Sequence, residues 1–310
     1  MKLFYTALFL GLLFSYGCKK NRTEEKDTNS PVSVTTKTIH KDLVYANGSQ
    51  AQKLDLYLPE TGNSFPLVIW IHGGGWQSGD KAQFANTPMF KALIARGYAV
   101  AAVNYRLSDE AKFPAQIFDV KAAVRWLKAN AIMYKLNSSK FGAWGSSAGG
   151  HLTALLATSS GVTALEDMAQ GNSSQSTKIQ VAVDWFGPIN LLLMEEMAKS
   201  HGCPARTNLP NSPESLLMGY PIQEKPSQTL TASPISYLST DDPPMYIQHG
   251  KLDCTVSYLQ SQLIYDSMKA FKPQTDLQLK FLENSGHGGN EFETSANISG
   301  VIDFLDKYLK

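Results

Sequence analysis

Several short runs of residues in this chain are apolar on both faces, which is typical of strands that are covered by helices on both sides. The runs lie at residues 66–71, 98–103, 141–144, 179–186 and 245–248. Two half-buried strands are expected before them, at 43–45 and 53–58, and in the second of these leucine alternates with other residues. A further strand is expected at 277–282, near the end of the chain.

Between these strands, apolar residues recur at the spacing of amphipathic helices. The three stripes are Ile117, Val120, Val124 and Leu127; Leu152, Leu155 and Leu156; and Ile298, Ile302, Leu305 and Leu309. Regular alternation of strand and helix predicts an α/β fold with an open, mostly parallel sheet and helices on both faces. Residues 191–234 are rich in Pro, Ser and Asn and interrupt the alternation. We expect them to form an insertion over the strand ends, where such sheets bind their ligands.

The first residues have the pattern of an export signal. Lys2 precedes an apolar run at 7–14, which is too short to span a bilayer, and small residues lead up to Cys18. This pattern predicts a lipoprotein-type signal peptide at 1–17, with Cys18 as the lipid-modified new N-terminus; the alternative is an ordinary cleaved signal with an incidental cysteine. The polar segment 18–38 is then a flexible tether, and 39–310 the catalytic domain. We expect an exported protein that is attached to a membrane only through Cys18 and faces the periplasm or the cell exterior.

Composition excludes several classes of protein. The 28 Lys and Arg nearly balance the 27 Asp and Glu, without a long basic run, which argues against nucleic-acid binding. A hydrophobic content of 43% is too high for a disordered chain. Three cysteines cannot supply a structural zinc site, and we expect neither a metal nor a cofactor. If Cys18 is acylated, Cys203 and Cys254 are left in a compartment that permits disulfides, and they are either paired or two unpaired buried thiols.

Residues 145–149 have the pattern G-x-S-x-G, with Ser147 at its centre. The motif directly follows the apolar run 141–144 and directly precedes the helical stripe that starts at Leu152. A strand that turns sharply into a helix holds the central serine in a strained, exposed position, and the turn closes only with small flanking residues. Ser146 lacks this glycine spacing. The pattern therefore predicts Ser147 as a catalytic nucleophile.

A second glycine motif, His72-Gly73-Gly74-Gly75-Trp76, follows the apolar strand 66–71. Successive glycines allow the backbone to approach a ligand closely and to turn its N–H groups inward. We expect the amides of Gly74, Gly75 and Ala148 to form an oxyanion hole, and His72 to support the loop. The sequence contains no phosphate-binding glycine motif, and no strand follows closely enough for a glycine-rich hairpin.

A nucleophilic serine needs a base, and the base needs a carboxylate that orients it. The chain has six histidines, at positions 40, 72, 151, 201, 249 and 287. His287 is the best candidate because it lies in a glycine-containing loop, 284–289, between the strand 277–282 and the last helix. The order serine, acid, histidine is usual in this type of fold, so the acid is expected between Ser147 and His287.

Asp253 follows the apolar strand 245–248 and suits the role of the acid. Three other aspartates are rivals for it. Asp184 lies inside or at the end of a strand and is expected to be a structural or site-wall carboxylate. Asp241 and Asp242 precede their strand, which places them at the wrong end of the sheet. Cys254 is the neighbour of Asp253, so a disulfide there would stiffen the site.

With these motifs in place, the chain resembles the α/β-hydrolase superfamily over about residues 40–310. The resemblance rests on HGGGW at 72–76, on GSSAGGH at 145–151, and on Asn104-Tyr105-Arg106 after the intervening strand. Phe113-Pro114-Ala115-Gln116 and Asp184-Trp185-Phe186-Gly187-Pro188 are also similar to the bacterial branch of carbohydrate esterases, of the acetyl or feruloyl type. More broadly, the chain is similar to the hormone-sensitive-lipase-like esterases.

The resemblance implies an eight-stranded sheet, a triad of Ser147, His287 and Asp253, and an oxyanion hole from Gly74, Gly75 and Ala148. In place of the helical cap of the lipase-like members, this chain has a short polar segment before its first strand. That departure argues against lipid hydrolysis and favours a bulky, sugar-bearing substrate.

We therefore expect a serine carboxylesterase that acts on short-chain or aryl esters, with a small-molecule or carbohydrate ester as substrate. The alternative on the same fold is an amide hydrolase, similar to a formamidase or a dipeptidyl peptidase. A third reading, a binding protein that has lost activity, fits less well because no triad member is missing. Trp76 and Trp185 lie at strand ends near the catalytic loops and are candidates for stacking on the substrate, although large aromatics more often belong to the core.

Overall fold

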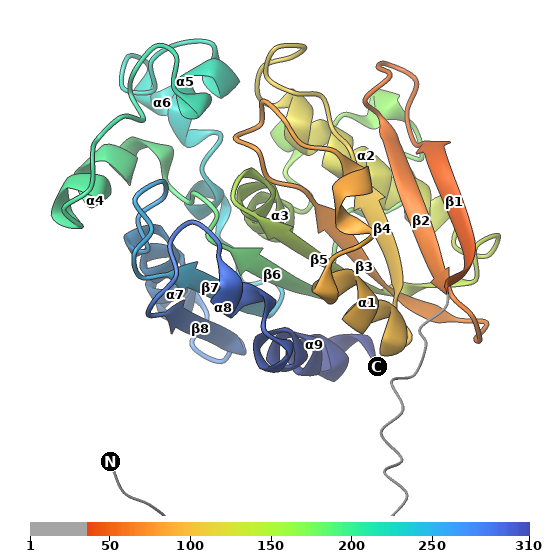
Figure 1. Cartoon of the computed structure of the whole chain (residues 1–310). Coiled ribbons are helices and arrows are strands. Elements are labelled where there is room, and N and C mark those ends of the chain that lie inside the picture. Colours follow the sequence, from red (N-terminus) through yellow and green to blue (C-terminus); the bar gives the residue numbers. More distant parts are fainter. Residues whose placement is uncertain (1–35) are drawn as a thin grey trace, which may run out of the picture. The chain divides into compact units, whose positions relative to one another are not determined.

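The computed structural model describes residues 36–310, and by their contacts Val34–Lys310 form one unit (Figure 1). The predicted signal, Cys18 and most of the predicted tether lie outside the described residues. Within residues 36–310, no helix combines the length and the hydropathy that are needed to cross a bilayer.

A sheet of eight strands forms the centre of the described chain, in the spatial order β1-β2-β4-β3-β5-β6-β7-β8. The strands are β1 Thr36–Val44, β2 Lys53–Pro59, β3 Phe65–Ile71, β4 Ala99–Val103, β5 Leu136–Ser146, β6 Val181–Trp185, β7 Met245–Gly250 and β8 Leu277–Leu282. The β1–β2 and β2–β4 pairs are antiparallel, and every other pair is parallel. The predicted mostly parallel α/β fold is confirmed.

The first strand is longer than the sequence pattern indicated. The pattern predicts a strand at 43–45 and a tether up to residue 38, whereas β1 already begins at Thr36 and pairs with β2 from there. The reason is that β1 is an edge strand, and Ile39 and Val44 are about half exposed. Its backbone pairing therefore defines it better than any apolar pattern does.

Helices cover both faces of the sheet and create two apolar cores. The α-helices are α1 Pro88–Ala95, α2 Ala115–Ala129, α3 Ala148–Thr158, α4 Met194–Ser200, α5 Pro213–Met218, α6 Pro226–Leu230, α7 Leu259–Phe271, α8 Asn290–Glu293 and α9 Ser295–Leu309. Short 3₁₀ helices lie at Lys81–Phe84, Thr163–Leu165, Met168–Gln170, Leu191–Leu193 and Pro234–Tyr237. One core contains side chains of α2, α3 and α7, and the other contains side chains of α1 and α9.

The central strands are apolar on both faces because each face meets one of these cores. In β3, for example, Ile69 and Ile71 belong to the core on the α2–α3 side, while Val68 and Trp70 belong to the opposite core. Side chains of consecutive strand residues point to opposite faces. In a strand between two helix layers, the side chains on both faces are therefore buried. The parallel strands β3 to β8 all have their carboxyl ends at the same edge, where the loops with the candidate catalytic residues begin.

The segment 191–234 folds into short helices, α4, α5 and α6, which Figure 1 shows grouped to one side of the sheet. Its Pro213 and Glu214 line the cavity beside Ser147. The segment therefore reaches the candidate active site, as expected for an insertion over the strand ends.

Candidate active site

Ser147 occupies a sharp turn between β5, which ends at Ser146, and α3, which begins at Ala148. Its backbone has φ 55° and ψ −122°, a conformation that L-residues rarely adopt and that is typical of a strained, exposed nucleophile. A Cβ atom on Gly149 would lie 2.0 Å from the carbonyl oxygen of Ile71, and one on Gly145 would lie 2.2 Å from that of Gly149. Both motif glycines are therefore required by close backbone contacts.

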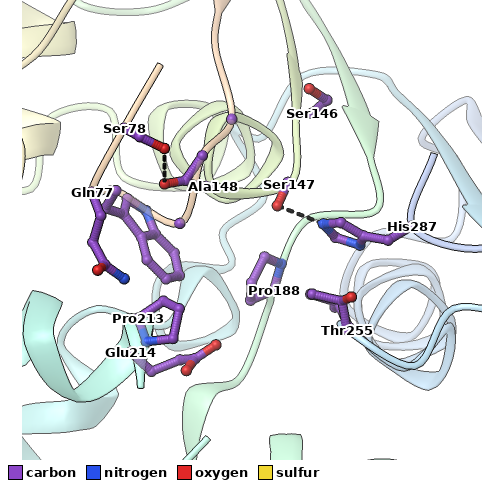
Figure 2. A pocket seen from close by; sticks show the side chains of 15 residues that line it. Gln77, Ser78, Ser146, Ser147, Ala148, Pro188, Pro213, Glu214, Thr255 and His287 are labelled. Atoms are coloured by element: carbon purple, nitrogen blue, oxygen red, sulfur yellow. Dashed lines mark hydrogen bonds between the residues drawn. The ribbon is translucent and has the colours of Figure 1, made fainter. Parts of the chain in front are cut away.

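His287 lies in the loop after β8 and contacts Ser147 directly. Its Nε2 is 2.7 Å from the Ser147 Oγ (Figure 2), and its Nδ1 is 2.7 Å from Oδ2 of Asp253. The ring also packs edge-on against Phe186, with the ring centroids 4.8 Å apart. With Nδ1–H donating to the carboxylate, Nε2 is free to accept the serine proton.

Asp253 is fully buried in the loop after β7 and has all of its acceptor sites occupied. Oδ1 accepts the backbone N–H groups of Thr255 at 2.8 Å and Val256 at 3.0 Å, while Oδ2 accepts from His287 and from His249. Burial alone would raise the pKa of the carboxyl, but the hydrogen bonds from the two histidines outweigh it and hold the pKa well below its ordinary value. Asp253 therefore stays ionised.

His249 is a second histidine on the same carboxylate, and no role for it is expected from the sequence. It is completely buried at the end of β7. Its Nε2 faces two acceptors, Asp253 Oδ2 at 3.1 Å and the Val256 carbonyl at 2.8 Å, so this nitrogen carries the proton. Its Nδ1, 2.7 Å from the Ser261 Oγ, then accepts from that hydroxyl. In the sequence His249 lies four residues before Asp253, but this spacing alone does not predict that the two side chains meet.

The glycine loop after β3 turns back on itself. The Gly74 carbonyl accepts the N–H groups of Gln77 at 3.0 Å and Ser78 at 3.1 Å, and also the Ser78 hydroxyl (Figure 2). Gly74 and Gly75 have φ values of 105° and 59°, which favour glycine. Within residues 36–310, the N–H groups of Gly74, Gly75 and Ala148 are used by no hydrogen bond. They are therefore available to an oxyanion.

Two aromatic residues position this loop. The His72 ring stacks on Tyr105 with the ring centroids 4.5 Å apart, and the Tyr105 hydroxyl donates to the His72 carbonyl at 3.0 Å. Trp76 donates from Nε1 to His151 Nδ1 at 3.3 Å, and His151 in turn contacts the Ala232 carbonyl through Nε2. His72 and His151 are thus parts of the support of the loop.

A cavity of about 490 Å³ opens beside Ser147. It is lined by residues 73–78 and 146–148, and by Pro188, Pro213, Glu214, Thr255, Val256 and His287. Trp76 is among the lining residues, although its side chain is only 1% exposed. Trp185 is not among them and lines a separate cavity of about 170 Å³, together with Ser146, Phe186 and Gly288. Its expected contact with a substrate stays a prediction. Its indole points to the other face of the sheet, where it packs edge-on against Trp144 and Phe292.

Cys203 and Cys254 form a disulfide with Cα atoms 5.2 Å apart, which confirms the paired alternative of the sequence analysis. The bond joins the end of the α4 region to the residue that follows Asp253, across a sequence separation of 51. It therefore links the insertion directly to the loop of the candidate acid.

The rival aspartates are placed elsewhere. Asp242 bonds to Ser239 just before β7, at the opposite end of that strand from His287. Asp184 is fully buried in β6, where Oδ1 accepts the Gly187 N–H at 2.9 Å and Oδ2 has no partner. Burial raises its pKa from 3.8 to about 7, and the Gly187 N–H only partly opposes this. Asp184 is thus a buried carboxyl beneath the start of α3, as expected for a structural role.

The raised pKa of Asp184 predicts a specific effect of pH on stability. Because the folded state holds this proton more tightly than the unfolded chain, wild-type stability falls as the pH rises from about 4 to about 7. Asp184→Asn removes this dependence. The free energy of unfolding of the variant relative to wild type should therefore increase by about 2–3 kcal/mol between pH 5 and pH 8. Urea unfolding at both pH values measures it, and a difference that does not change with pH would contradict the assignment.

No group of three or more His, Cys, Asp or Glu side chains in residues 36–310 is arranged to hold a metal ion.

Comparison with known proteins places this geometry in a family. The chain is 30% identical over 273 residues to the esterase LipQ of Mycobacterium tuberculosis, and this match covers 85% of this chain and 61% of LipQ. It is 28% identical over 237 residues to LipM of the same organism, a probable carboxylic ester hydrolase, which covers 75% of this chain and 52% of LipM. The chain thus spans about half to three fifths of the length of these curated relatives.

Among solved structures, a truncated carbohydrate esterase from gut microbiota has a TM-score of 0.81 and 29% sequence identity, and the match covers 89% of this chain and 98% of that one. This agrees with the sheet and helix arrangement, and the fold is that of the α/β-hydrolases. The BD-FAE family model matches residues 54–268, which include Ser147 and Asp253. The chain therefore belongs to the BD-FAE family.

Proposed function

We propose that this protein is a serine carboxylesterase that hydrolyses short-chain or aryl carboxylic esters joined to a carbohydrate. The observation that carries the proposal is the continuous hydrogen-bonded line from Ser147 through His287 to Asp253, which opens on a cavity beside three free backbone amides. The names of the similar proteins, esterases and a carbohydrate esterase, support the same reaction class.

In the proposed mechanism, the Ser147 Oγ attacks the ester carbonyl while its proton moves to His287 Nε2. The carbonyl oxygen becomes an oxyanion, which accepts hydrogen bonds from the amides of Gly74, Gly75 and Ala148. When the C–O bond of the ester breaks, the alcohol leaves with the proton from His287. The serine then carries the acyl group.

Water completes the reaction by the same steps in the opposite direction. His287 takes a proton from the water as it attacks the acyl-enzyme, and it returns that proton to the Ser147 Oγ as the acid leaves. Throughout, the buried Asp253 carboxylate keeps the proton of the histidine on Nδ1 and stabilises the imidazolium that forms twice in each turnover.

A panel of purified substrates tests the proposed function. We expect hydrolysis of p-nitrophenyl acetate, acetylated xylan and methyl ferulate, weaker action on long-chain p-nitrophenyl esters, and little on the matching p-nitroanilides. The weaker action on long-chain esters is expected because a short polar segment precedes the first strand in place of a helical cap. The weak action on anilides is expected because an amide carbonyl is less electrophilic than an ester carbonyl. Faster turnover of anilides than of esters would favour the amide hydrolase, and no turnover of any ester would refute the proposal.

A further inference from the structure

The Asp253 carboxylate lies between two pairs that each consist of a serine and a histidine. One pair, His287 and Ser147, lines the cavity. The other pair, His249 and Ser261, is completely buried. Both histidines bond to the same carboxylate oxygen, Oδ2, His287 at 2.7 Å and His249 at 3.1 Å. A continuous hydrogen-bonded line of five side chains therefore runs from the buried serine to the candidate nucleophile.

The contacts of His249 fix the position of its proton. Nε2 faces the carboxylate and, at 2.8 Å, the carbonyl oxygen of Val256, so this nitrogen carries a hydrogen. Nδ1 lies 2.7 Å from the Ser261 hydroxyl, which donates to it. The ring belongs to the end of β7 and the hydroxyl belongs to α7, so two elements hold the imidazole in place. Its N–H is therefore a fixed donor to Asp253.

A fixed donor changes what the carboxylate offers to His287. The charge of Oδ2 is shared between two N–H groups, so each of them receives less of it than it would alone. Burial raises the pKa of the Asp253 carboxyl, and the hydrogen bond from His249 opposes this rise more than any other contact does. A carboxylate that attracts protons less strongly also stabilises the imidazolium form of its partner less.

The surroundings leave this effect to His249. Within residues 36–310, the Asp253 carboxylate has ion-pair geometry only with the two histidines. The His287 ring also contacts the Ser147 hydroxyl and the ring of Phe186, which carry no charge. Because His249 and Asp253 are completely buried, water does not screen the effect of one on the other.

Glu214 and Glu291 also bear on the pH dependence of the site. Glu214 lines the same cavity as His287, and burial raises its pKa from 4.5 to about 7. Glu291 accepts a hydrogen bond of 2.8 Å from Ser285, in the same loop as His287. A substitution of His249 changes neither glutamate, so a difference in pH dependence between variants reports the loss of the His249 donor.

We propose that His249 is a positioning residue for the esterase reaction, which holds the Asp253 carboxylate and competes with His287 for the same oxygen. This inference rests on the proposed function and adds to it a control of the working pH range. His249 is not among the residues that line the cavity at Ser147, so it acts on the reacting atoms only through Asp253. With His249 in place, His287 stays available as a base at a lower pH than it would with Asp253 alone.

The pH dependence of kcat/KM for p-nitrophenyl acetate tests this role. His249→Phe retains a ring but removes the donor, so the midpoint of the acid limb should move up by about 0.5–1 pH unit, with about a tenfold loss of kcat at the plateau. His249→Gln can place an amide NH₂ near the position of Nε2, and its midpoint should lie within about 0.3 unit of wild type. Equal midpoints in wild type and His249→Phe, or the same shift in both variants, would overturn the inference.

Gln248→Leu is the matched control for a general loss of stability. Gln248 is the buried neighbour of His249 on β7, and it exchanges two hydrogen bonds of 2.9 Å with Asn297 on the opposite face of the sheet. The substitution should lower the temperature of unfolding and move the acid limb by no more than about 0.2 pH unit. A shift as large as that of His249→Phe would mean that any disturbance of β7 has this effect, which contradicts the proposed role.

Proton NMR separates a failure of this inference from a failure of the proposed function, because it needs no substrate. The imidazole signal of His287, identified by its absence in His287→Gln, is followed against pH in wild type, His249→Phe and Ser261→Ala. The pH at which this ring takes up its second proton should rise by about 0.5–1 unit in His249→Phe. It should rise by a smaller amount in Ser261→Ala, where His249 is a weaker donor, and this milder variant decides the test if His249→Phe does not fold.

An upward shift in these titrations supports the inference even if the protein hydrolyses no ester. An unchanged or lower pH of protonation in the folded variants overturns it and leaves the esterase proposal standing.

Discussion

Ser147→Ala should reduce kcat for p-nitrophenyl acetate by about 10⁴-fold or more. The variant loses the atom that lies 2.7 Å from His287 Nε2, and with it the acyl-enzyme route. The three amides of the glycine loop and α3 remain, so weak catalysis by oxyanion stabilisation alone should persist above the rate in water. Initial rates at saturating substrate measure the loss. Thermal unfolding checks that the variant folds despite the unusual backbone of this position.

Ser146→Ala is the matched control for this experiment. Ser146 is the adjacent serine, but within residues 36–310 its hydroxyl makes no hydrogen bond to His287, which bonds to Ser147 instead. Because Ser146 only lines the cavity, Ser146→Ala should keep kcat for p-nitrophenyl acetate within about tenfold of the wild-type value. A fluorophosphonate reagent should label wild type and Ser146→Ala and leave Ser147→Ala unlabelled. Labelling of Ser147→Ala, or unchanged turnover in that variant, would overturn the assignment of the nucleophile.

Asp253→Asn should lower kcat by about 10⁴-fold, because the substitution changes which nitrogen of His287 carries the proton. In the wild type, the Oδ1 of Asp253 accepts two backbone N–H groups, from Thr255 and Val256. The asparagine oxygen will take the same place, which turns the amide NH₂ toward His287 and His249. His287 Nδ1 must then accept a hydrogen bond, so its proton moves to Nε2, where it blocks the transfer from Ser147.

The pH profile distinguishes this cause from a general loss of structure. A base with its proton on the wrong nitrogen can be bypassed by hydroxide, so the activity of Asp253→Asn should keep rising at alkaline pH, beyond the plateau of wild type. Asp266→Asn is a suitable control, because Asp266 is exposed on α7 and its substitution removes the same charge. If Asp253→Asn retained more than about a tenth of wild-type kcat, Asp253 would be no more than a structural carboxylate.

The candidate catalytic loops were predictable because the backbone geometry restricts which residues they can contain. The turn at Ser147 requires glycine at positions 145 and 149, where any Cβ would clash with the backbone of Gly149 or Ile71. This requirement can be recognised directly in the amino-acid sequence. The strands before these loops are buried on both faces and therefore appear as continuous apolar runs. Parallel strands then bring loops that are 140 residues apart, those of Ser147 and His287, to the same edge of the sheet.

Three features of the structure, helix α7, the contact of His249 and the position of Trp185, were not predicted from the sequence. Helix α7 buries Gln260 and Ser261 together with Ile264, so its inner face does not look apolar. His249 contacts Asp253 only because the loop after β7 folds back, and that fold is not a property of spacing alone. Trp185 was expected in the cavity because it ends a strand. Side chains alternate along β6, however, and Trp185 shares the face of Val181 and Val183.

The disulfide between Cys203 and Cys254 sets a condition for changing the specificity of this scaffold. One of its cysteines belongs to the segment that supplies Pro213 and Glu214 to the cavity wall, and the other follows Asp253, the proposed acid. Exchange of residues 191–234 for the corresponding segment of a relative would therefore remove a cross-link as well as a cavity wall, and would leave Cys254 as a free thiol beside Asp253. A productive graft should carry a cysteine at the position of 203, or should replace Cys254 at the same time, so that substrate choice is altered without releasing the acid loop.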